Sequence, residues 1–258
     1  MEYRRIRVES TPGVLRVSLG APALDARTVA ELRGALDAAE TDQDCRAVVL
    51  AGRPGVFCTG MDLRGALDDD HAPQEFAALL RRLTLVPRVV VAEVDGQVSG
   101  GGVGLVAAAD LVHATPRSSF GLPEALWGLL PCVVLPYLAR RIGPGRATTM
   151  ALTTRPLDAA EACARGLVDE VGDQPDAWLA QLLVRLERID ARTLDAAKRY
   201  AAELWPVTEE TGRLAARAFE RLLTGPVARE RLTGFVTTGR LPWESDGVAA
   251  KAGKEARA

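Results

Sequence analysis

The chain has 258 residues, 48% of them hydrophobic and 26% charged, with a formal net charge of −2 and a pI of about 5.9. This length can bury a sizeable core, and the composition is typical of a soluble globular protein. The small net charge excludes the strongly basic field by which proteins attract nucleic acid.

The first fifty residues predict a hairpin followed by a strand, helix and strand crossover. Residues 3–8 and 13–19 alternate apolar and polar side chains around the turn at Thr11-Pro12-Gly13. Residues 26–39 carry apolar side chains at helical spacing, and Asp25 stands where a helix cap is expected. Residues 46–50 then have the composition of a buried strand.

A second crossover follows and leads to a run of glycines. The acidic residues 65–74 predict a solvated, mobile loop, and residues 76–85 return to a helical pattern. The apolar strand 89–94 then leads to Ser99-Gly100-Gly101-Gly102, after which an apolar helix runs to Ala109. Short strands are expected at 110–114 and 118–120. Repeated strand, helix and strand units predict an α/β core with parallel pairing.

The C-terminal part of the chain is predicted to be helical, apart from a short strand at 168–171. We divide the chain into a core at residues 1–190 and a C-terminal helical region at 191–258, with a tail from Trp243 that frays. The predicted helices span residues 135–142, 146–152, 158–164, 178–189, 191–204, 208–223 and 227–235.

Cysteines, histidines and apolar runs restrict the compartment and the kind of site. The four cysteines contain no CxxC pair, and the N-terminus lacks the pattern of a signal peptide, so we expect a reduced, cytoplasmic protein. His71 and His113 cannot form a His-rich metal site, and His113 is interpreted as a strand residue. No metal or membrane span is predicted. The cysteines are Cys45, Cys58, Cys132 and Cys163.

The glycine triplet is the most informative stretch. Glycines let a ligand lie against the main chain, and a helix N-terminus favours negative charge. A Walker phosphate loop is excluded because no Gly-Lys-Ser/Thr follows the glycines, and the dinucleotide pattern G-x-G-x-x-G is met only loosely. Taken alone, the triplet is compatible with a phosphate site, an oxyanion site or a tight turn.

A second informative stretch, Gly121 to Pro131, is almost wholly apolar except for Glu124. Apolar surroundings disfavour the ionised form of a carboxyl group, so the pKa of Glu124 is expected to rise toward neutrality. The alternative interpretation is a carboxylate that caps a helix after Pro123, and the two roles are compatible.

With these segments in view, the sequence resembles the enoyl-CoA hydratase/isomerase, or crotonase, superfamily over nearly its whole length. The resemblance implies an α/β crotonase fold, a spiral of ββα units whose C-terminal helical region mediates trimerisation, and chemistry on an acyl thioester. The motifs that carry it are Val56-Phe57-Cys58-Thr59-Gly60-Met61-Asp62, Val98-Ser99-Gly100-Gly101-Gly102, Phe120-Gly121-Leu122-Pro123-Glu124 and the stretch 162–168.

The resemblance also implies roles for individual residues. The family's oxyanion hole falls on the backbone N–H groups of Met61 and Gly101, with Gly60 and Gly100 beside them in the substrate site. Many hydratases of the family use two glutamates. The second corresponds to Glu124, whereas the first falls on Gly104, which cannot transfer a proton.

Three further stretches resemble the first of two paired crotonase-type enzymes in polyketide β-branching cassettes. That group dehydrates 3-hydroxy-3-methylglutaryl on an acyl carrier protein to the 3-methylglutaconyl thioester, and it also lacks the first glutamate. The stretches are residues 131–143, 152–156 and 237–243.

This resemblance implies that Glu124 removes a proton from C2 and, in a syn elimination, returns it to the leaving C3 hydroxyl. Asp62 is interpreted either as a second catalytic group or as a residue that fixes its loop. Trp127 and Cys132 are assigned to substrate binding by resemblance, although a core aromatic and a small buried thiol are the simpler interpretations. Tyr137 is interpreted as a core aromatic.

No cofactor is expected beyond the phosphopantetheine of an acyl carrier protein, or CoA, that carries the substrate. The predicted partners are an acyl carrier protein and further copies of the chain, in a homotrimer or a dimer of trimers. Three alternatives stay open, namely a methylglutaconyl decarboxylase, a general enoyl-CoA hydratase/isomerase and an inactive trimeric scaffold. Basic clusters offer candidate docking surfaces for the acidic carrier or are merely solvated, at Arg81, Arg82, Arg88, Arg140, Arg141 and Arg146.

Overall fold

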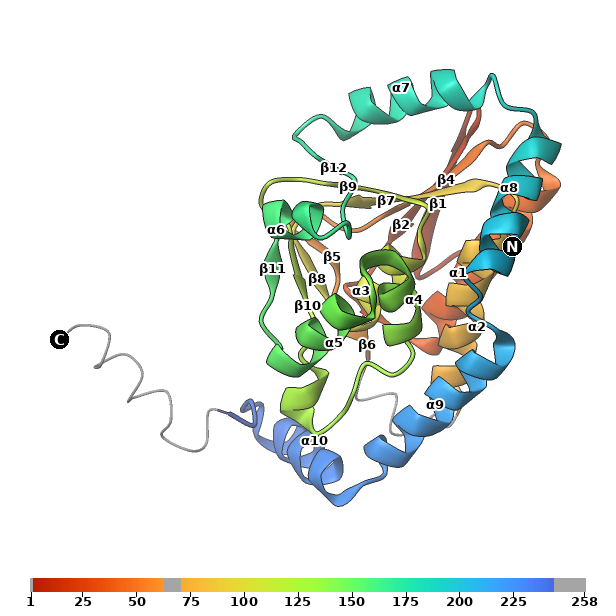
Figure 1. Cartoon of the computed structure of the whole chain (residues 1–258). Coiled ribbons are helices and arrows are strands. Elements are labelled where there is room, and N and C mark those ends of the chain that lie inside the picture. The colour runs from red at the N-terminus through yellow and green to blue at the C-terminus, as the bar shows by residue number, and fades with distance from the viewer. Residues whose placement is uncertain (1, 63–70, 244–258) are drawn as a thin grey trace.

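The computed structural model describes residues 2–62 and 71–243. Strands form two larger sheets and one small one, and helices pack between and around them (Figure 1). The helices α1 and α2 lie along one side, whereas α9 and α10 lie at the end of the molecule opposite α7 (Figure 1).

The largest sheet has six strands in the order β1-β2-β4-β7-β9-β12. The first two strands form the predicted antiparallel hairpin, with Ile6 opposite Leu19, and the later neighbours pair in parallel. The crossovers run through α1, α2 and α3, which confirms the parallel α/β core. The strands are β1 (Ile6–Thr11), β2 (Val14–Leu19), β4 (Ala47–Ala51), β7 (Val89–Val94), β9 (Leu111–Ala114) and β12 (Glu170–Val171).

A four-stranded sheet, in the order β11-β10-β8-β5, brings the two informative stretches of the sequence together. Parallel pairing of β8 and β10 places Ser99 opposite Gly121, so the glycine triplet and the segment before Glu124 start from neighbouring strand ends. The remaining strands are β5 (Val56–Cys58), β8 (Gln97–Ser99), β10 (Ser119–Gly121) and β11 (Leu157–Asp158), with β3 (Ala23–Leu24) and β6 (Gly60–Met61) in a two-stranded sheet.

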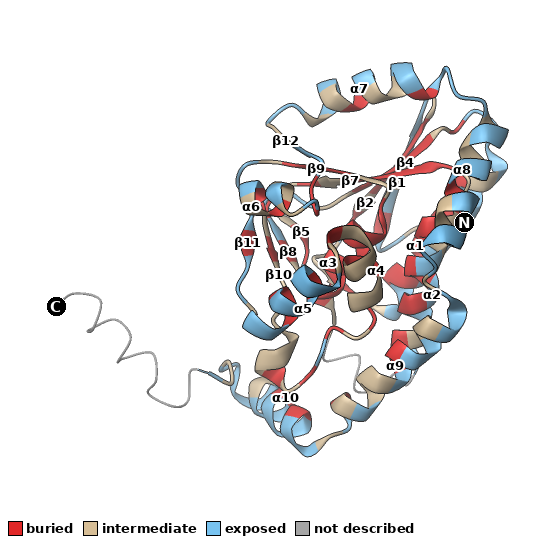
Figure 2. Ribbon diagram, in the orientation of Figure 1, coloured by how far each residue is buried: buried red, intermediate tan, exposed pale blue. Residues whose placement is uncertain are grey.

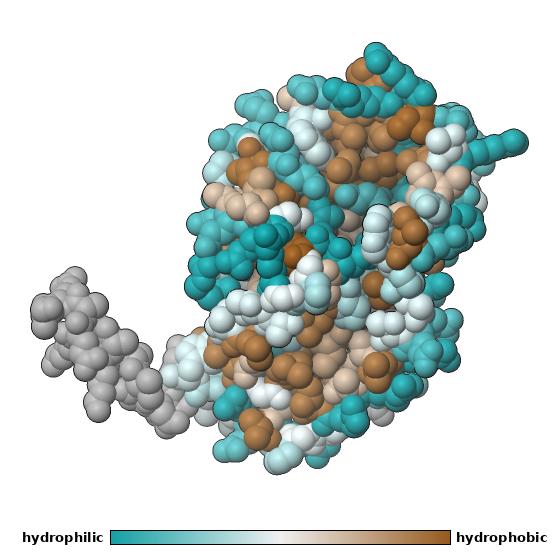
Figure 3. Space-filling model, viewed as in Figure 1, coloured by the Kyte–Doolittle hydropathy of each residue, from teal (hydrophilic) through white to brown (hydrophobic). Residues whose placement is uncertain are grey.

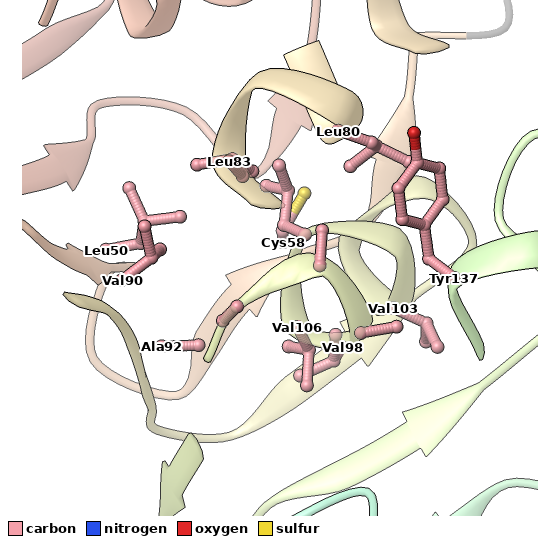
Figure 4. Packing of buried hydrophobic residues seen from close by; sticks show 14 of the residues in the cluster. Leu50, Cys58, Leu80, Leu83, Val90, Ala92, Val98, Val103, Val106 and Tyr137 are labelled. Atoms are coloured by element: carbon pink, nitrogen blue, oxygen red, sulfur yellow. The ribbon is translucent and has the colours of Figure 1, made fainter. Parts of the chain in front are cut away.

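The helix α3 lies at the centre of the fold. All of its residues are buried, as expected of a helix that is apolar on every side. Figure 2 shows the same burial along the central strands, and in Figure 4 Val103 and Val106 of this helix lie in the buried cluster with Leu80 and Tyr137. Tyr137 is thus a core aromatic, as predicted.

The other helices surround this core, and η2 is a 3-10 helix. Their bounds are α1 (Ala26–Thr41), α2 (Ala72–Leu85), α3 (Gly101–Ala108), η2 (Glu124–Trp127), α4 (Leu135–Ile142), α5 (Pro144–Thr153), α6 (Ala159–Ala164), α7 (Pro175–Leu186), α8 (Ala191–Leu204), α9 (Glu209–Leu223) and α10 (Pro226–Thr238).

Several local predictions can be compared with these bounds. Asp25 caps α1 as expected, since its carboxylate accepts a hydrogen bond from the Thr28 N–H at 2.7 Å. His113 lies buried on β9, as predicted. The loop prediction for 65–74 is wrong where α2 begins at Ala72, because Pro73 fits the first turn of a helix. The rest of that loop, residues 65–70, and the tail at 244–258 lie outside the described residues.

Two of the basic residues considered for docking are engaged inside the protein. Arg88 is 6% exposed and donates to the carbonyls of Ala39, Glu40 and Asp42 at the C-terminal end of α1. Arg141 donates to Leu167 O, Ala109 O and the Asp169 carboxylate. We therefore remove Arg88 from the docking candidates, because its guanidinium satisfies buried carbonyls instead of facing solvent.

The C-terminal helices are attached to the core by buried and polar contacts. Lys198 on α8 is 8% exposed, and its ammonium donates to Leu83 O, Arg88 O and Asp110 Oδ2. The helix α9 packs along α2, and α10 packs against η2. No helix within 2–62 and 71–243 is long and apolar enough to cross a membrane. The division at residue 190 stays a prediction.

Candidate active site

A cavity of about 480 Å³ lies where the glycine triplet, the loop at residues 59–62 and the η2 segment meet. The structure brings every residue that the sequence assigned to the site into its wall. Those residues are Gly60, Met61, Asp62, Gly100, Gly101, Glu124, Trp127 and Cys132.

Two backbone segments approach each other closely at one side of this cavity. A methyl group on Gly60 would lie 3.0 Å from the amide nitrogen of Gly101, and one on Gly101 would lie 3.4 Å from the amide nitrogen of Met61. Gly101 is the first residue of α3, where N–H groups have no partner within the helix. The amides of Met61 and Gly101 therefore lie side by side at the positive end of a buried helix.

The loop that carries Met61 is held on its other side. The N–H of Thr59 donates to Pro22 O, and the N–H of Asp62 donates to Leu24 O, both at 2.8 Å. These bonds connect the loop, on either side of Met61, to β3 and to the residue directly before it. A fixed backbone of this kind provides the preorganised donors that stabilise a developing oxyanion.

Glu124 begins η2 directly after Pro123, and its carboxyl group points toward the glycine triplet. A methyl group on Gly100 would lie 3.2 Å from Glu124 Oε1. Gly100 has a φ of 53°, a conformation that L side chains rarely adopt, and its N–H donates to Gly121 O at 3.0 Å. Glycine at this position therefore leaves space for the carboxyl group and permits the turn into α3.

Burial sets the ionisation of Glu124. Desolvation raises the pKa of its carboxyl group to about 7, partly offset by a backbone hydrogen bond. Oε2 of Glu124 is buried and has no hydrogen-bond partner among the described residues. A carboxyl group in this state is protonated and ionised in comparable amounts near neutral pH, which suits general acid–base catalysis.

Gly104, where the family's first glutamate would stand, is closely packed by apolar side chains. A methyl group on Gly104 would lie 3.1 Å from Val134 Cγ2, 3.2 Å from Leu80 Cδ1 and 3.4 Å from Phe76 Cζ. Carbon atoms pack at about 3.5–4.0 Å. Apolar side chains therefore crowd the place where a glutamate side chain at position 104 would begin.

Sequence reasoning missed several apolar residues of the cavity wall. Phe76 of α2 also reaches Gly101, since a methyl group there would lie 3.3 Å from its Cζ. Phe219 of α9 and Phe235 of α10 close the cavity from the C-terminal helices, where apolar side chains gather in the lower part of the face shown in Figure 3. Trp127 packs edge-on against Phe235 with ring centroids 5.2 Å apart.

The charges in this wall are few. Its described residues include two carboxylates, Asp62 and Glu124, and no lysine, arginine or histidine. Burial raises the pKa of the Cys132 thiol, so Cys132 is a neutral lining group. Within the described parts of the chain, no cluster of three or more histidine, cysteine or acidic residues could hold a metal ion.

Comparison with known proteins identifies relatives along the whole chain. The family model "Enoyl-CoA hydratase/isomerase" matches residues 9–246. The bacillaene synthase dehydratase PksH of Bacillus subtilis is 30% identical over 253 residues, which are 94% of this chain and 97% of that protein.

Solved structures agree with this match. The crystal structure of PksH has a TM-score of 0.87 at 29% identity and covers 93% of this chain and 100% of that chain. An enoyl-CoA hydratase from Mycobacterium avium has a TM-score of 0.82 at 30% identity and covers 93% of this chain and 99% of that chain. These likenesses confirm the predicted crotonase fold.

Proposed function

The chain belongs to the enoyl-CoA hydratase/isomerase family, and from this premise we propose that it is a hydro-lyase of polyketide biosynthesis. The substrate that we propose is 3-hydroxy-3-methylglutaryl on an acyl carrier protein, and the product is 3-methylglutaconyl on the same carrier. One observation carries the proposal. The Glu124 carboxyl group is buried and has a pKa of about 7, and apolar side chains crowd Gly104, where a second glutamate would stand. The similarity to a bacillaene synthase dehydratase supports the pathway.

The reaction begins with acidification of C2. The thioester oxygen accepts hydrogen bonds from the N–H groups of Met61 and Gly101, which stabilise the enolate that forms when ionised Glu124 takes a C2 proton. Removal of one such donor in other enzymes costs about 3 kcal/mol of transition-state stabilisation.

Elimination completes the reaction. The enolate re-forms the carbonyl, a C2–C3 double bond forms and the C3–O bond breaks. The protonated Glu124 gives its proton to the departing hydroxide, so one water leaves and the carboxylate returns to its starting state. One carboxyl group serves as base and then as acid, which requires a syn geometry and no second glutamate.

Asp62 belongs to the same proposal, in one of two roles. Its backbone fixes the loop through Leu24 O, and its side chain lines the cavity. Asp62→Asn distinguishes the roles. If turnover falls while the melting temperature is unchanged, Asp62 takes part in proton transfer or water binding; if both fall together, it holds the loop.

We also propose that the chain works as a homotrimer or a dimer of trimers. Large apolar side chains are exposed toward the end of α8, where Tyr200 is 63% exposed and Trp205, the residue directly after the helix, is 61% exposed. Apolar surface of this kind favours association. Sedimentation of the purified protein tests the stoichiometry, and a monomer at micromolar concentration would contradict it.

The decisive experiment supplies carrier-bound 3-hydroxy-3-methylglutaryl and measures the product by mass spectrometry. Loss of one water supports the proposal, whereas loss of carbon dioxide from carrier-bound methylglutaconyl would identify a decarboxylase. Faster turnover of the CoA ester than of the carrier-bound form would favour a general hydratase.

Variants test whether the cavity is the active site. We expect Glu124→Gln to abolish dehydration and Glu203→Gln, at an exposed position on α8, to leave it unchanged. Dehydration at the wild-type rate by Glu124→Gln would refute the mechanism. Absence of turnover of every thioester by the wild-type protein would favour an inactive scaffold.

A further inference from the structure

A second cavity, of about 420 Å³, lies at the opposite end of α3 from the candidate active site. The two cavities share no described lining residue. Gly101, at the start of α3, lines the first cavity, whereas Ala107, near the end of the helix, lines the second. At a rise of about 1.5 Å per residue, these two residues lie about 9 Å apart along the helix axis. The second cavity is therefore a separate feature that the proposed dehydration does not use.

One face of α8 provides much of the wall of this second cavity. Leu194 and Ala201 lie on that face at helical spacing, and Trp205 follows directly after the helix. Trp205 is 61% exposed, so solvent reaches this part of the wall. Apart from Thr84 and the charged groups, the described wall is apolar. A cavity of this size, mostly apolar with a few convergent polar groups, is typical of a binding site for a small molecule.

Most of the charged groups in this wall are already paired. Lys198 uses its ammonium on two backbone carbonyls and on the Asp110 carboxylate, which also accepts a hydrogen bond from the Val90 N–H at 2.8 Å. Arg141 donates to two backbone carbonyls and to the Asp169 carboxylate. Each of these cations is therefore neutralised by a carboxylate of the protein, and neither is left to bind a ligand.

Arg140 of α4 is the cation of this wall that has no counterion. Its side chain is half-buried and lines the cavity, and within 2–62 and 71–243 its guanidinium makes no hydrogen bond or ion pair, in contrast to that of Arg141. Burial lowers the pKa of Arg140, although a guanidinium in a protein stays protonated. A charge that is partly removed from water without a counterion is costly, and a bound anion would offset that cost.

We infer that the second cavity is a binding site for a small organic monoanion, a carboxylate with an apolar body, whose head group pairs with Arg140. One cation without a counterion matches a single negative charge, and a planar guanidinium binds a carboxylate through two parallel hydrogen bonds. The apolar face of α8 and the ring of Trp205 contact the body of the ligand. This inference does not depend on which thioester the active site takes.

Isothermal titration calorimetry with octanoate tests the site, in a buffer free of carboxylate and phosphate. Octanamide has the same length and no charge, whereas inorganic phosphate has the charge and no apolar body. The proteins are the wild type, Arg140→Met, Arg140→Lys, Ala201→Trp and Arg199→Met. Arg199 is an exposed arginine on α8 that does not line the cavity, so its variant is the matched control for the loss of one positive charge.

We expect the wild type to bind a single octanoate per chain, and octanamide and phosphate at least about tenfold more weakly. Arg140→Met weakens octanoate binding by at least about tenfold, the usual effect of losing a charge-assisted hydrogen bond. Arg140→Lys loses less, because the charge is kept and the bidentate geometry is lost. Ala201→Trp keeps the cation and fills the cavity, so it also blocks octanoate. Arg199→Met binds octanoate as the wild type does.

Other outcomes overturn the inference. Equal affinity of the wild type for octanoate and octanamide would show that the charge is not recognised, and equal octanoate binding by all five proteins would place the ligand elsewhere. A wild type that binds no octanoate at millimolar concentration would also contradict it. Sedimentation would then show whether Arg140→Met alone dissociates the protein, which would assign Arg140 to a contact between copies of the chain. Melting temperatures identify a variant that fails to fold, and the test then rests on the other substitutions.

Discussion

Glu124 couples stability to pH in a direction opposite to most carboxylates. Its pKa is about 7 in the folded protein and near 4.5 in the unfolded chain. Between these values the unfolded chain releases a proton that the folded protein keeps, so the free energy of unfolding falls as pH rises. This contribution of Glu124 to the free energy of unfolding is fully present below pH 4.5 and is lost above pH 7. It amounts to about 3 kcal/mol, because each unit of pKa shift corresponds to about 1.4 kcal/mol.

Glu124→Gln isolates this effect, because glutamine has nearly the same shape and does not ionise. We expect the free energy of unfolding of the variant, minus that of the wild type, to increase by about 3 kcal/mol between pH 4.5 and pH 8. Urea unfolding across this range measures the difference. The wild-type kcat/KM should rise as pH passes about 7, since the base must be ionised.

Glu31 provides the control of opposite sign. Its carboxylate accepts hydrogen bonds from the N–H groups of Arg4, Arg5 and Ile6, and its pKa is lowered to about 2 despite burial. Glu31→Gln should therefore destabilise the protein by a constant amount from pH 5 to pH 8. If the difference in free energy of unfolding between Glu124→Gln and wild type does not vary with pH, burial does not raise the pKa of Glu124 and the prediction is wrong.

Three further variants probe the site and its support. Gly100→Ala introduces about 1–3 kcal/mol of backbone strain and a methyl group 3.2 Å from Glu124 Oε1, and steady-state kinetics should show kcat lower by at least about tenfold. Gly104→Glu places a charged side chain among apolar groups, so urea unfolding should show a loss of more than about 3 kcal/mol without any gain of hydratase activity. Lys198→Met removes three hydrogen bonds and the ion pair with Asp110, and it should cost about 3 kcal/mol by the same measurement, with kcat unchanged.

The order of elements was predictable because local patterns decide it. The parallel core follows from apolar strands alternating with amphipathic helices, and the α1 cap follows from Asp25. Glu124 and the glycine triplet could also be identified, because an isolated carboxylate in an apolar run and three adjacent glycines are unusual in themselves. Their proximity needs the β8–β10 register, which only the fold supplies.

The wall of the cavity could not be predicted, since its members come from distant helices. Phe76, Phe219 and Phe235 each fit an ordinary amphipathic pattern, and nothing in that pattern separates a wall residue from a core residue. Arg88 shows that the position of a charged side chain is equally hard to predict. A surface arginine and one that satisfies buried carbonyls have the same appearance in a sequence.

The filled space at Gly104 and the raised pKa of Glu124 form one arrangement. A second ionised carboxylate would disfavour ionisation of the first, whereas here desolvation alone brings the pKa of Glu124 to about 7. A hydratase that adds water to a double bond benefits from two groups that hold the water between them. An elimination in which the same carboxyl group takes a proton and returns it needs one group that is easily ionised and easily protonated. Apolar packing of Phe76, Leu80 and Val134 around Gly104 therefore supports the proposed dehydration over a mechanism that pairs Glu124 with a glutamate at position 104.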